Sequence, residues 1–268
     1  MKSLLPIALL AGVLSAQSIP PTYIGQTKFQ TGQDVVPAYE GWLRNTDGTF
    51  TMVFGYLNRN WKEEPVIPVG DDNKLEPGPM DRGQPTYFLP RRQAFIFRVV
   101  LPKEWDTKQE LVWTLRVNGR TEKAYGTLSA DEEITERMIM TRGGLSPGED
   151  DPNKPPVISV ADPVGPAQAG LPIQLVATVT DDGLPKPRAA PKPRAGGAPA
   201  QTNSVEAPRP RGLSVTWLEY RGPAKVAFDS TRSMQPTVTF SAPGTYVLQA
   251  IASDGALATR TSVTITVN

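Results

Sequence analysis

Apolar and polar residues alternate along much of the chain, and this period-two pattern is the strongest constraint on its fold. In the clearest example, alternate positions are held by Leu111, Trp113, Leu115 and Val117. Only a strand with one buried face needs this pattern, because successive side chains of a strand point to opposite sides of a sheet. Proline supplies 28 of the 268 residues, about twice its usual share of roughly 5%. The sequence therefore predicts an all-β protein.

The predicted strands fall into two groups. The first group covers residues 39–44, 49–58, 94–101, 111–117 and 122–128, and the second covers 158–160, 172–180, 213–220, 237–241, 244–253 and 259–267. Asp47-Gly48 and Asn118-Gly119 lie between strands of the first group and favour tight hairpin turns. Short strands separated by turns predict two β-sandwich domains in tandem, at residues 30–140 and 157–268.

Three segments of the first half lack the alternation. Residues 63–92 contain six prolines, and a loop of that length is uncommon unless it binds something or is mobile. Ser129 and Glu132 fit a capping box, which predicts one short helix over about residues 130–140, between the two domains. Residues 141–156 are rich in Gly, Pro and Asp and are expected to form the interdomain linker.

The N-terminus has the layout of a secretory signal peptide over residues 1–16. Lys2 supplies a positive charge, an apolar run follows from Leu4 to Leu14, and the small residues Ser15 and Ala16 precede the expected cleavage point. Such a run is too short to cross a hydrocarbon core about 30 Å thick. We expect the mature protein to be exported to the periplasm, the cell surface or the medium, with no direct membrane insertion after cleavage.

The absence of two residue types removes several classes of function. The chain has no cysteine and no histidine, which excludes disulfides, Cys/His zinc sites, haem, iron–sulfur clusters and Ser-His-Asp triads. Without Lys2 of the expected signal peptide, 27 basic residues balance 27 acidic ones. A chain with no basic surplus is not expected to bind nucleic acid. Binding chemistry without an obligatory cofactor remains, and we expect no enzymatic activity.

The second group of strands carries a family resemblance. The motifs are Asn-Lys-Pro-Pro-Val at 153–157, Leu-Val-Ala-Thr-Val-Thr-Asp-Asp-Gly at 175–183, Val-Thr-Trp at 215–217 with Gly-Pro at 222–223, Phe-Ser-Ala-Pro-Gly-Thr-Tyr-Val-Leu at 240–248 and Ser-Asp-Gly at 253–255. Together they resemble a bacterial Ig-like domain of the PKD type over about residues 153–268. The resemblance implies a stable sandwich that serves as a spacer, an adhesive unit or a partner-binding unit, usually without catalysis.

Two aromatic residues of this segment have structural roles that the strand pattern itself predicts. Trp217 lies on the same strand face as Val215 and is expected to fill the centre of the sandwich. Tyr246 follows the Pro243-Gly244 turn and is expected to be a buried ring whose hydroxyl bonds to the backbone.

One insertion departs from the family pattern. Residues 184–212 contain seven prolines and six basic residues against one acid, a composition that favours extended chain and cannot form a core. We expect a disordered loop. The alternative is a basic tether that docks on an acidic polymer or in a groove of another protein, and the candidate contact residues are Lys186, Arg188, Lys192 and Arg194.

Carboxylates are the remaining candidates for site chemistry. Ca²⁺ takes six to eight oxygen ligands, and the candidate ligands near the second domain are Asp151, Asn153, Asp181, Asp182 and Asp254. Asp-Gly pairs also form turns that bind no metal. Glycan hydrolysis needs two carboxylates that flank the scissile bond, and the acids of residues 63–92 are Glu63, Glu64, Asp71, Asp72 and Asp81. Surface loops, however, carry many acids without any catalytic role.

Trp61 and Trp105 stand at predicted strand ends beside charged residues and are candidate binding residues for a sugar ring or a protein partner. The function favoured by these observations is a secreted, non-catalytic envelope or extracellular protein that binds or supports a protein or polysaccharide partner. The alternative is a carbohydrate-binding module or a carboxylate-based accessory to glycan hydrolysis.

Overall fold

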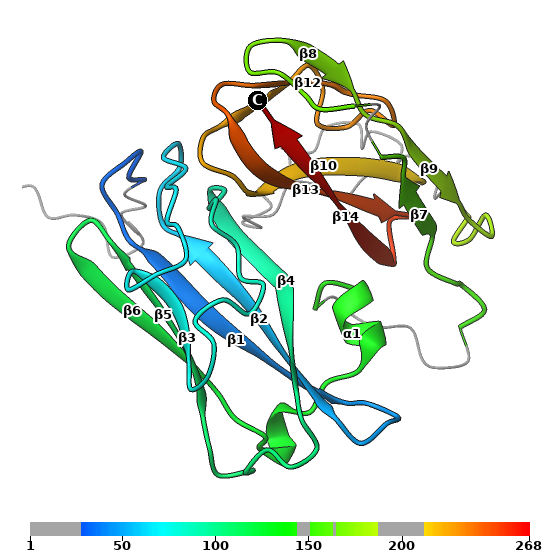
Figure 1. Ribbon diagram of the computed structural model, residues 1–268. Coiled ribbons are helices and arrows are strands. Elements are labelled where there is room, and N and C mark those ends of the chain that lie inside the picture. The colour runs from blue at the N-terminus through cyan, green and yellow to red at the C-terminus, as the bar shows by residue number, and fades with distance from the viewer. Residues whose placement is uncertain (1–27, 144–150, 163–164, 187–211) are drawn as a thin grey trace, which may run out of the picture.

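The computed structural model describes residues 28–143, 151–162, 165–186 and 212–268. The expected signal peptide, and Arg188, Lys192 and Arg194 of the basic insertion, lie outside the described residues. Within these residues the fold is all-β apart from two short helical turns, and the strands form two sandwiches in tandem (Figure 1). No helix in this part of the chain has the length and apolar character needed to cross a membrane.

The first sandwich has two antiparallel three-stranded sheets. One sheet has the order β1-β2-β4 and the other the order β3-β5-β6. The strands are β1 (Val35–Arg44), β2 (Phe50–Asn58), β3 (Asn73–Glu76), β4 (Arg91–Leu101), β5 (Leu111–Val117) and β6 (Arg120–Gly126).

The predicted alternation places the core of this first sandwich correctly. Leu111, Trp113 and Leu115 of β5 are fully buried. Trp113 has the rings of Phe54, Phe88 and Phe97 around it, with centroid distances between 4.8 and 6.4 Å. Aromatic pairs at these separations stabilise a core beyond the burial of their surface area.

The second sandwich has one sheet of order β10-β13-β14, another of order β11-β12-β8 and a two-stranded β7-β9 sheet. The strands are β7 (Val157–Val160), β8 (Pro172–Gln174), β9 (Ala177–Thr180), β10 (Ser214–Arg221), β11 (Val226–Phe228), β12 (Thr237–Phe240), β13 (Gly244–Ser253) and β14 (Ala258–Val267).

The two aromatic residues predicted for the centre of this sandwich are buried there. Trp217 is 2% exposed, and its Nε1 donates to the Ser233 carbonyl at 2.9 Å. Tyr246 is fully buried, and its hydroxyl donates to the Ala242 carbonyl at 2.9 Å. Gly222 passes so close to this ring that an added Cβ would lie 2.4 Å from a Tyr246 ring carbon. Any side chain at residue 222 would therefore displace the tyrosine.

The predicted short helix between the domains is present, but it does not extend over residues 130–140. Ala130–Glu132 forms a single 3₁₀ turn (η1), and the α-helix α1 covers only Glu136–Met140. The Ser129 side chain makes no capping hydrogen bond, and the cap of α1 is Thr135. The intervening chain is extended because the Ile134 N–H donates to a backbone carbonyl of β1 at 2.8 Å, a tertiary contact that outweighs local helix preference.

The description of residues 63–92 as one loop without regular structure is also wrong. The segment contains β3 and a bridge between Val66 and Tyr87. Fully buried Asn73 organises it, since its Nδ2 donates to the carbonyls of Ile67 at 2.9 Å and Pro85 at 2.8 Å. Its Oδ1 accepts from Trp113 Nε1 at 3.0 Å. Side-chain hydrogen bonds here replace the hydrophobic alternation that marks longer strands.

Replacing Trp217 with alanine should lower the free energy of unfolding by about 3–5 kcal/mol, because the change leaves a large cavity in the second core. Urea unfolding of Trp217→Ala measures this loss. Val157→Ala on β7 is the matched control, because Val157 is 67% exposed and its truncation should change stability by less than about 0.5 kcal/mol. Equal stability of Trp217→Ala and the wild type would contradict the strand register.

Candidate functional site at the domain interface

The two sandwiches are joined by backbone hydrogen bonds between the 63–92 segment and β10. The Tyr220 carbonyl accepts from the N–H groups of Thr86 at 3.1 Å and Tyr87 at 3.2 Å. The Gly222 N–H donates to the Thr86 hydroxyl at 3.2 Å. Leu218 and Tyr220 of β10 also belong to the buried apolar cluster of the first sandwich. The segment expected to bind a partner therefore binds the second domain of its own chain.

Charged side chains add further contacts between the 63–92 segment and the second domain, and together we call all these contacts the joint. The Arg221 guanidinium contacts both carboxylate oxygens of Asp81, at 2.7 and 3.2 Å, and its Nε donates to the Gln84 carbonyl at 2.7 Å. The hydrogen bonds from Arg221 lower the pKa of the Asp81 carboxyl. Lys225 of the second domain contacts Glu64 of the first at 2.6 Å. Paired guanidinium–carboxylate contacts of this kind are directional as well as attractive.

The five acids named as candidates for glycan hydrolysis each contact another group of the same chain. Asp81 and Glu64 belong to the joint. Glu63 accepts from the Gly32 N–H at 2.5 Å. Asp71 lies 4.0 Å from Lys74, and Asp72 lies 3.6 Å from Arg116. These contacts give each of the five carboxylates a structural partner.

Glu219 is a buried acid that the sequence patterns did not single out. It is 3% exposed, next to an irregularity in the β10–β13 pairing. Its Oε2 accepts from the Val226 N–H at 2.8 Å, and its Oε1 has no hydrogen-bond partner among the described residues. Burial raises the pKa of Glu219 to about 8. The nearby Glu64 carboxylate also raises this pKa, whereas the hydrogen bond from the Val226 N–H lowers it.

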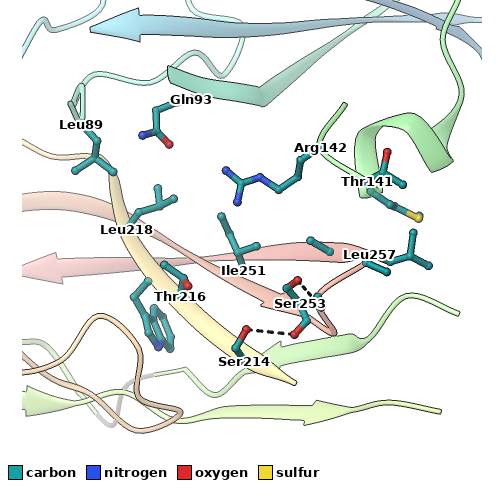
Figure 2. Close-up of a pocket in the computed structure, with 15 residues that line it drawn as sticks. Leu89, Gln93, Thr141, Arg142, Ser214, Thr216, Leu218, Ile251, Ser253 and Leu257 are labelled. Atoms are coloured by element: carbon teal, nitrogen blue, oxygen red, sulfur yellow. Dashed lines mark hydrogen bonds between the residues drawn. The ribbon is translucent and has the colours of Figure 1, made fainter. Parts of the chain in front are cut away.

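Two adjoining cavities, of about 220 and 540 Å³, lie between the domains, and together we call them the interdomain cleft. Their shared wall residues come from α1 and its end and from β13 and β14: Met140, Arg142, Ile251 and Ala258. Figure 2 shows Arg142 extending into the cleft, with Gln93 of β4 on one side and Ile251 of β13 on the other. Side chains from both domains thus face one space.

The structure does not bring the two candidate tryptophans together. Trp61 is half-buried, and Lys28 and Arg91 place cationic groups 4.6 and 4.3 Å from the centre of its ring. Trp105 packs against the edge of the first core, and its Nε1 donates to the Gln109 carbonyl at 3.2 Å. No ring contact within the described residues joins them, so they do not form a continuous aromatic platform.

The candidate calcium ligands serve mainly turns and one ion pair. Asp151 pairs with Arg137 at 2.8 Å, and Asp182 accepts from the N–H groups of Lys154 and Leu184, both at 2.9 Å. The Asn153 amide donates to Asp254 at 3.1 Å. No group of three acidic, His or Cys residues in the described ranges is placed to hold a metal ion.

Two oxygens of this set, Asn153 Oδ1 and Asp181 Oδ1, are buried and have no hydrogen-bond partner among the described residues. Calcium binding there stays a prediction. Lys186, the described member of the basic set, is exposed at the start of the insertion.

The residues of the interface escaped the sequence patterns for a physical reason. Tyr220, Arg221 and Arg142 stand among other polar and aromatic residues without a motif, and their roles depend on the contact between domains. Among the motifs noted in the sequence, the Gly-Pro pair after β10 came closest to marking the interface. Gly222 of this pair packs against Tyr246, and its N–H donates to the Thr86 hydroxyl of the first domain.

Comparison with known families and with characterised protein sequences finds no match. Among solved structures, the chain is similar to the D00-D0 domain of intimin, with 9% identity over 88% of this chain and 100% of that one and a TM-score of 0.27. Three N-terminal domains of the bacteriophage RB49 outer capsid protein Hoc match with 11% identity over 87% of this chain and a TM-score of 0.23. The four N-terminal Ig domains of Dscam1 isoform 4.44 match with 9% identity over 88% of this chain and a TM-score of 0.24.

The chain spans 58% of the length of the Hoc fragment and 54% of the Dscam1 fragment. Similarity at these TM-scores assigns the chain to no family.

The stability of the protein should fall as the pH rises through neutrality, because of Glu219. The folded protein retains this proton up to about pH 8, whereas the unfolded chain releases it near pH 4.3. Between these values the folded state binds more protons than the unfolded state, so the free energy of unfolding decreases with pH.

Glu219→Gln removes this titration while keeping the shape of the side chain. Its free energy of unfolding should exceed that of the wild type by about 2 kcal/mol or more at pH 9, and should lie close to it at pH 5. Urea unfolding at both pH values measures the difference. Glu104→Gln, at an exposed site, is the control and should show no such pH dependence. The same difference at both pH values would contradict a raised pKa.

Proposed function

We propose that this chain is an exported, non-catalytic protein of the cell envelope or extracellular space that binds or supports a protein or glycan partner. The observation that carries the proposal is the joint between the domains. Backbone hydrogen bonds, ion pairs and a shared apolar cluster hold two sandwiches in one arrangement. Such a body presents surfaces of both domains to one partner, which a flexible pair of modules does not do.

Several further features support a binding role over catalysis. The chain lacks the cysteine and histidine that most nucleophilic and metal-assisted mechanisms use. The acids of the 63–92 segment are engaged in structural contacts. Export is supported by the signal-peptide pattern of residues 1–16.

The PKD-type identity of the second domain belongs to this proposal. It is supported by three residues that carry the resemblance. Trp217 and Tyr246 are buried in the second core, the Tyr246 hydroxyl bonds to the backbone, and Gly222 lies too close to the Tyr246 ring to carry a side chain. As a spacer or partner-binding unit, a domain of this type would set the position of the first sandwich.

A protein partner is favoured over sugar stacking on Trp61. The cations of Lys28 and Arg91 lie over this ring, and a ring face occupied by a cation is not free to stack on a sugar. The carbohydrate-binding alternative therefore depends on surfaces other than a tryptophan platform.

Co-sedimentation of the purified mature chain with the insoluble envelope of its source organism tests the proposal. We expect binding that is lost when the envelope is first treated with protease, which indicates a protein partner. Binding that survives protease supports the glycan alternative, and the absence of binding to either preparation contradicts an envelope role.

A joint variant tests whether the arrangement of the domains matters. Arg221→Ala removes the contacts to Asp81 and Gln84 and should weaken co-sedimentation severalfold. Arg232→Ala removes an exposed arginine of the second domain and should bind as the wild type does. Unchanged binding by Arg221→Ala would show that one domain alone carries the partner site.

A further inference from the structure

We propose that the interdomain cleft binds a small hydroxylated molecule with one oxyanion group, of the class of acidic sugars, and that Arg142 and Arg260 hold the anion. The proposal goes beyond an envelope role and does not depend on it. It stands on the charge of the cleft, the pairing of its arginines and the polar groups beside them.

The walls of the cleft carry three arginines, and two of them have no carboxylate partner among the described residues. The larger cavity is lined by Arg98, Arg142 and Arg260, and no aspartate or glutamate of the described residues lines either cavity. Arg98 pairs with Glu136 outside the lining, at 2.5 and 2.8 Å. Neither Arg142 nor Arg260 has an ion pair with a carboxylate of the described residues. Two guanidinium groups therefore face the cleft without a counterion.

Arg260 of β14 carries the strongest argument. Its Nη1 donates only to neutral acceptors, the Ile96 carbonyl at 3.2 Å and Gln249 Oε1 at 3.3 Å. Burial lowers the pKa of Arg260 to about 10, and the positive charges of Arg142 and Arg98 act in the same direction. A partly buried cation among other cations is costly unless an anion compensates it. The planar guanidinium donors suit carboxylate and phosphate oxygens.

Arg142 is directed into the cleft by an unusual backbone conformation. It follows the end of α1 and has φ +55°, in the left-handed region that non-glycine residues rarely adopt. Its N–H donates to the Ile139 carbonyl at 2.9 Å, and the Gly143 N–H donates to the Met138 carbonyl at 3.0 Å. This helix end orients the side chain toward Gln93 and Ile251 (Figure 2). These two hydrogen bonds form a Schellman C-cap, so the end of the helix itself accounts for the positive φ of Arg142.

The smaller cavity supplies the complement for a hydroxylated ligand. Its wall includes Gln93 and the hydroxyl residues Ser214, Thr216 and Ser253, and amide and hydroxyl groups can both donate hydrogen bonds and accept them. Leu218 and Leu257 add apolar surface beside them. A few polar groups on an apolar wall are typical of small-molecule sites. An oxyanion next to such a wall fits a sugar acid or a sugar phosphate.

Isothermal titration calorimetry on the whole mature chain tests the proposal with three probes: glucuronate, glucose 6-phosphate and neutral glucose. We expect saturable binding of at least one anionic probe and no measurable binding of glucose. Glucuronate against glucose 6-phosphate distinguishes a carboxylate site from a phosphate site. The absence of binding of both anions up to about 10 mM, or equal affinity for glucose, would overturn the proposal.

Arginine variants locate the site. Arg142→Gln should bind the preferred anion about tenfold more weakly or worse, because it loses a charged hydrogen-bond donor. Arg142 is exposed, so this variant should fold normally, and Arg260→Gln is the second variant. Arg232→Gln, away from the cleft, should retain full affinity. If Arg142→Gln bound the anion with wild-type affinity, the anion would bind elsewhere and the proposal would be wrong. This outcome does not depend on the result of envelope co-sedimentation.

Discussion

The Tyr220 carbonyl accepts two amide hydrogen bonds from the first sandwich while its ring lies in the core of that sandwich. These contacts decide how the rest of the structure is arranged. A buried carbonyl must find donors, and here the donors come from the 63–92 segment of the other domain. β10 therefore belongs to the second sandwich by its pairing with β13 and to the first by its packing.

Both unusual ionisable groups lie on the domain interface. Glu219 precedes Tyr220 on β10 and is buried beside the Glu64–Lys225 ion pair. Arg260 of β14 reaches the Ile96 carbonyl of β4 across the interface. Burial removes water from both groups, which accounts for the opposite directions of their pKa shifts. Contact between the domains encloses the cleft, so the proposed anion site exists only while the domains stay in this arrangement.

Much of the fold could be predicted from residue patterns, because the long strands bury one face. β5 and β13 follow the predicted alternation, and Trp113, Trp217 and Tyr246 are buried as expected. The short strands β3 and β11 were missed, since three or four residues hold too little alternation to be distinguished from loop. The predicted helix is shorter than expected because the Ile134 N–H pairs with β1, a contact that no local pattern encodes.

The candidate site was far less predictable. The sequence favoured Trp61 and Trp105 as binding residues because both stand at strand ends beside charges. In the structure, Lys28 and Arg91 lie over the ring of Trp61, and Trp105 Nε1 donates to the Gln109 carbonyl. Arg142 and Arg260 are separated by more than a hundred residues and carry no motif. Only the docking of the domains brings them to one cleft, and docking depends on surface complementarity that sequence periodicity does not report.

The distance between spin labels on the two sandwiches tests the central claim, that the domains form one body, most directly. The chain has no cysteine of its own, so labels at Lys123→Cys on β6 and Thr245→Cys on β13, both exposed, are specific. Pulsed dipolar spectroscopy should give one narrow distance distribution, which Arg221→Ala broadens. A broad distribution in the otherwise unaltered chain would show that the domains move independently and would contradict the joint.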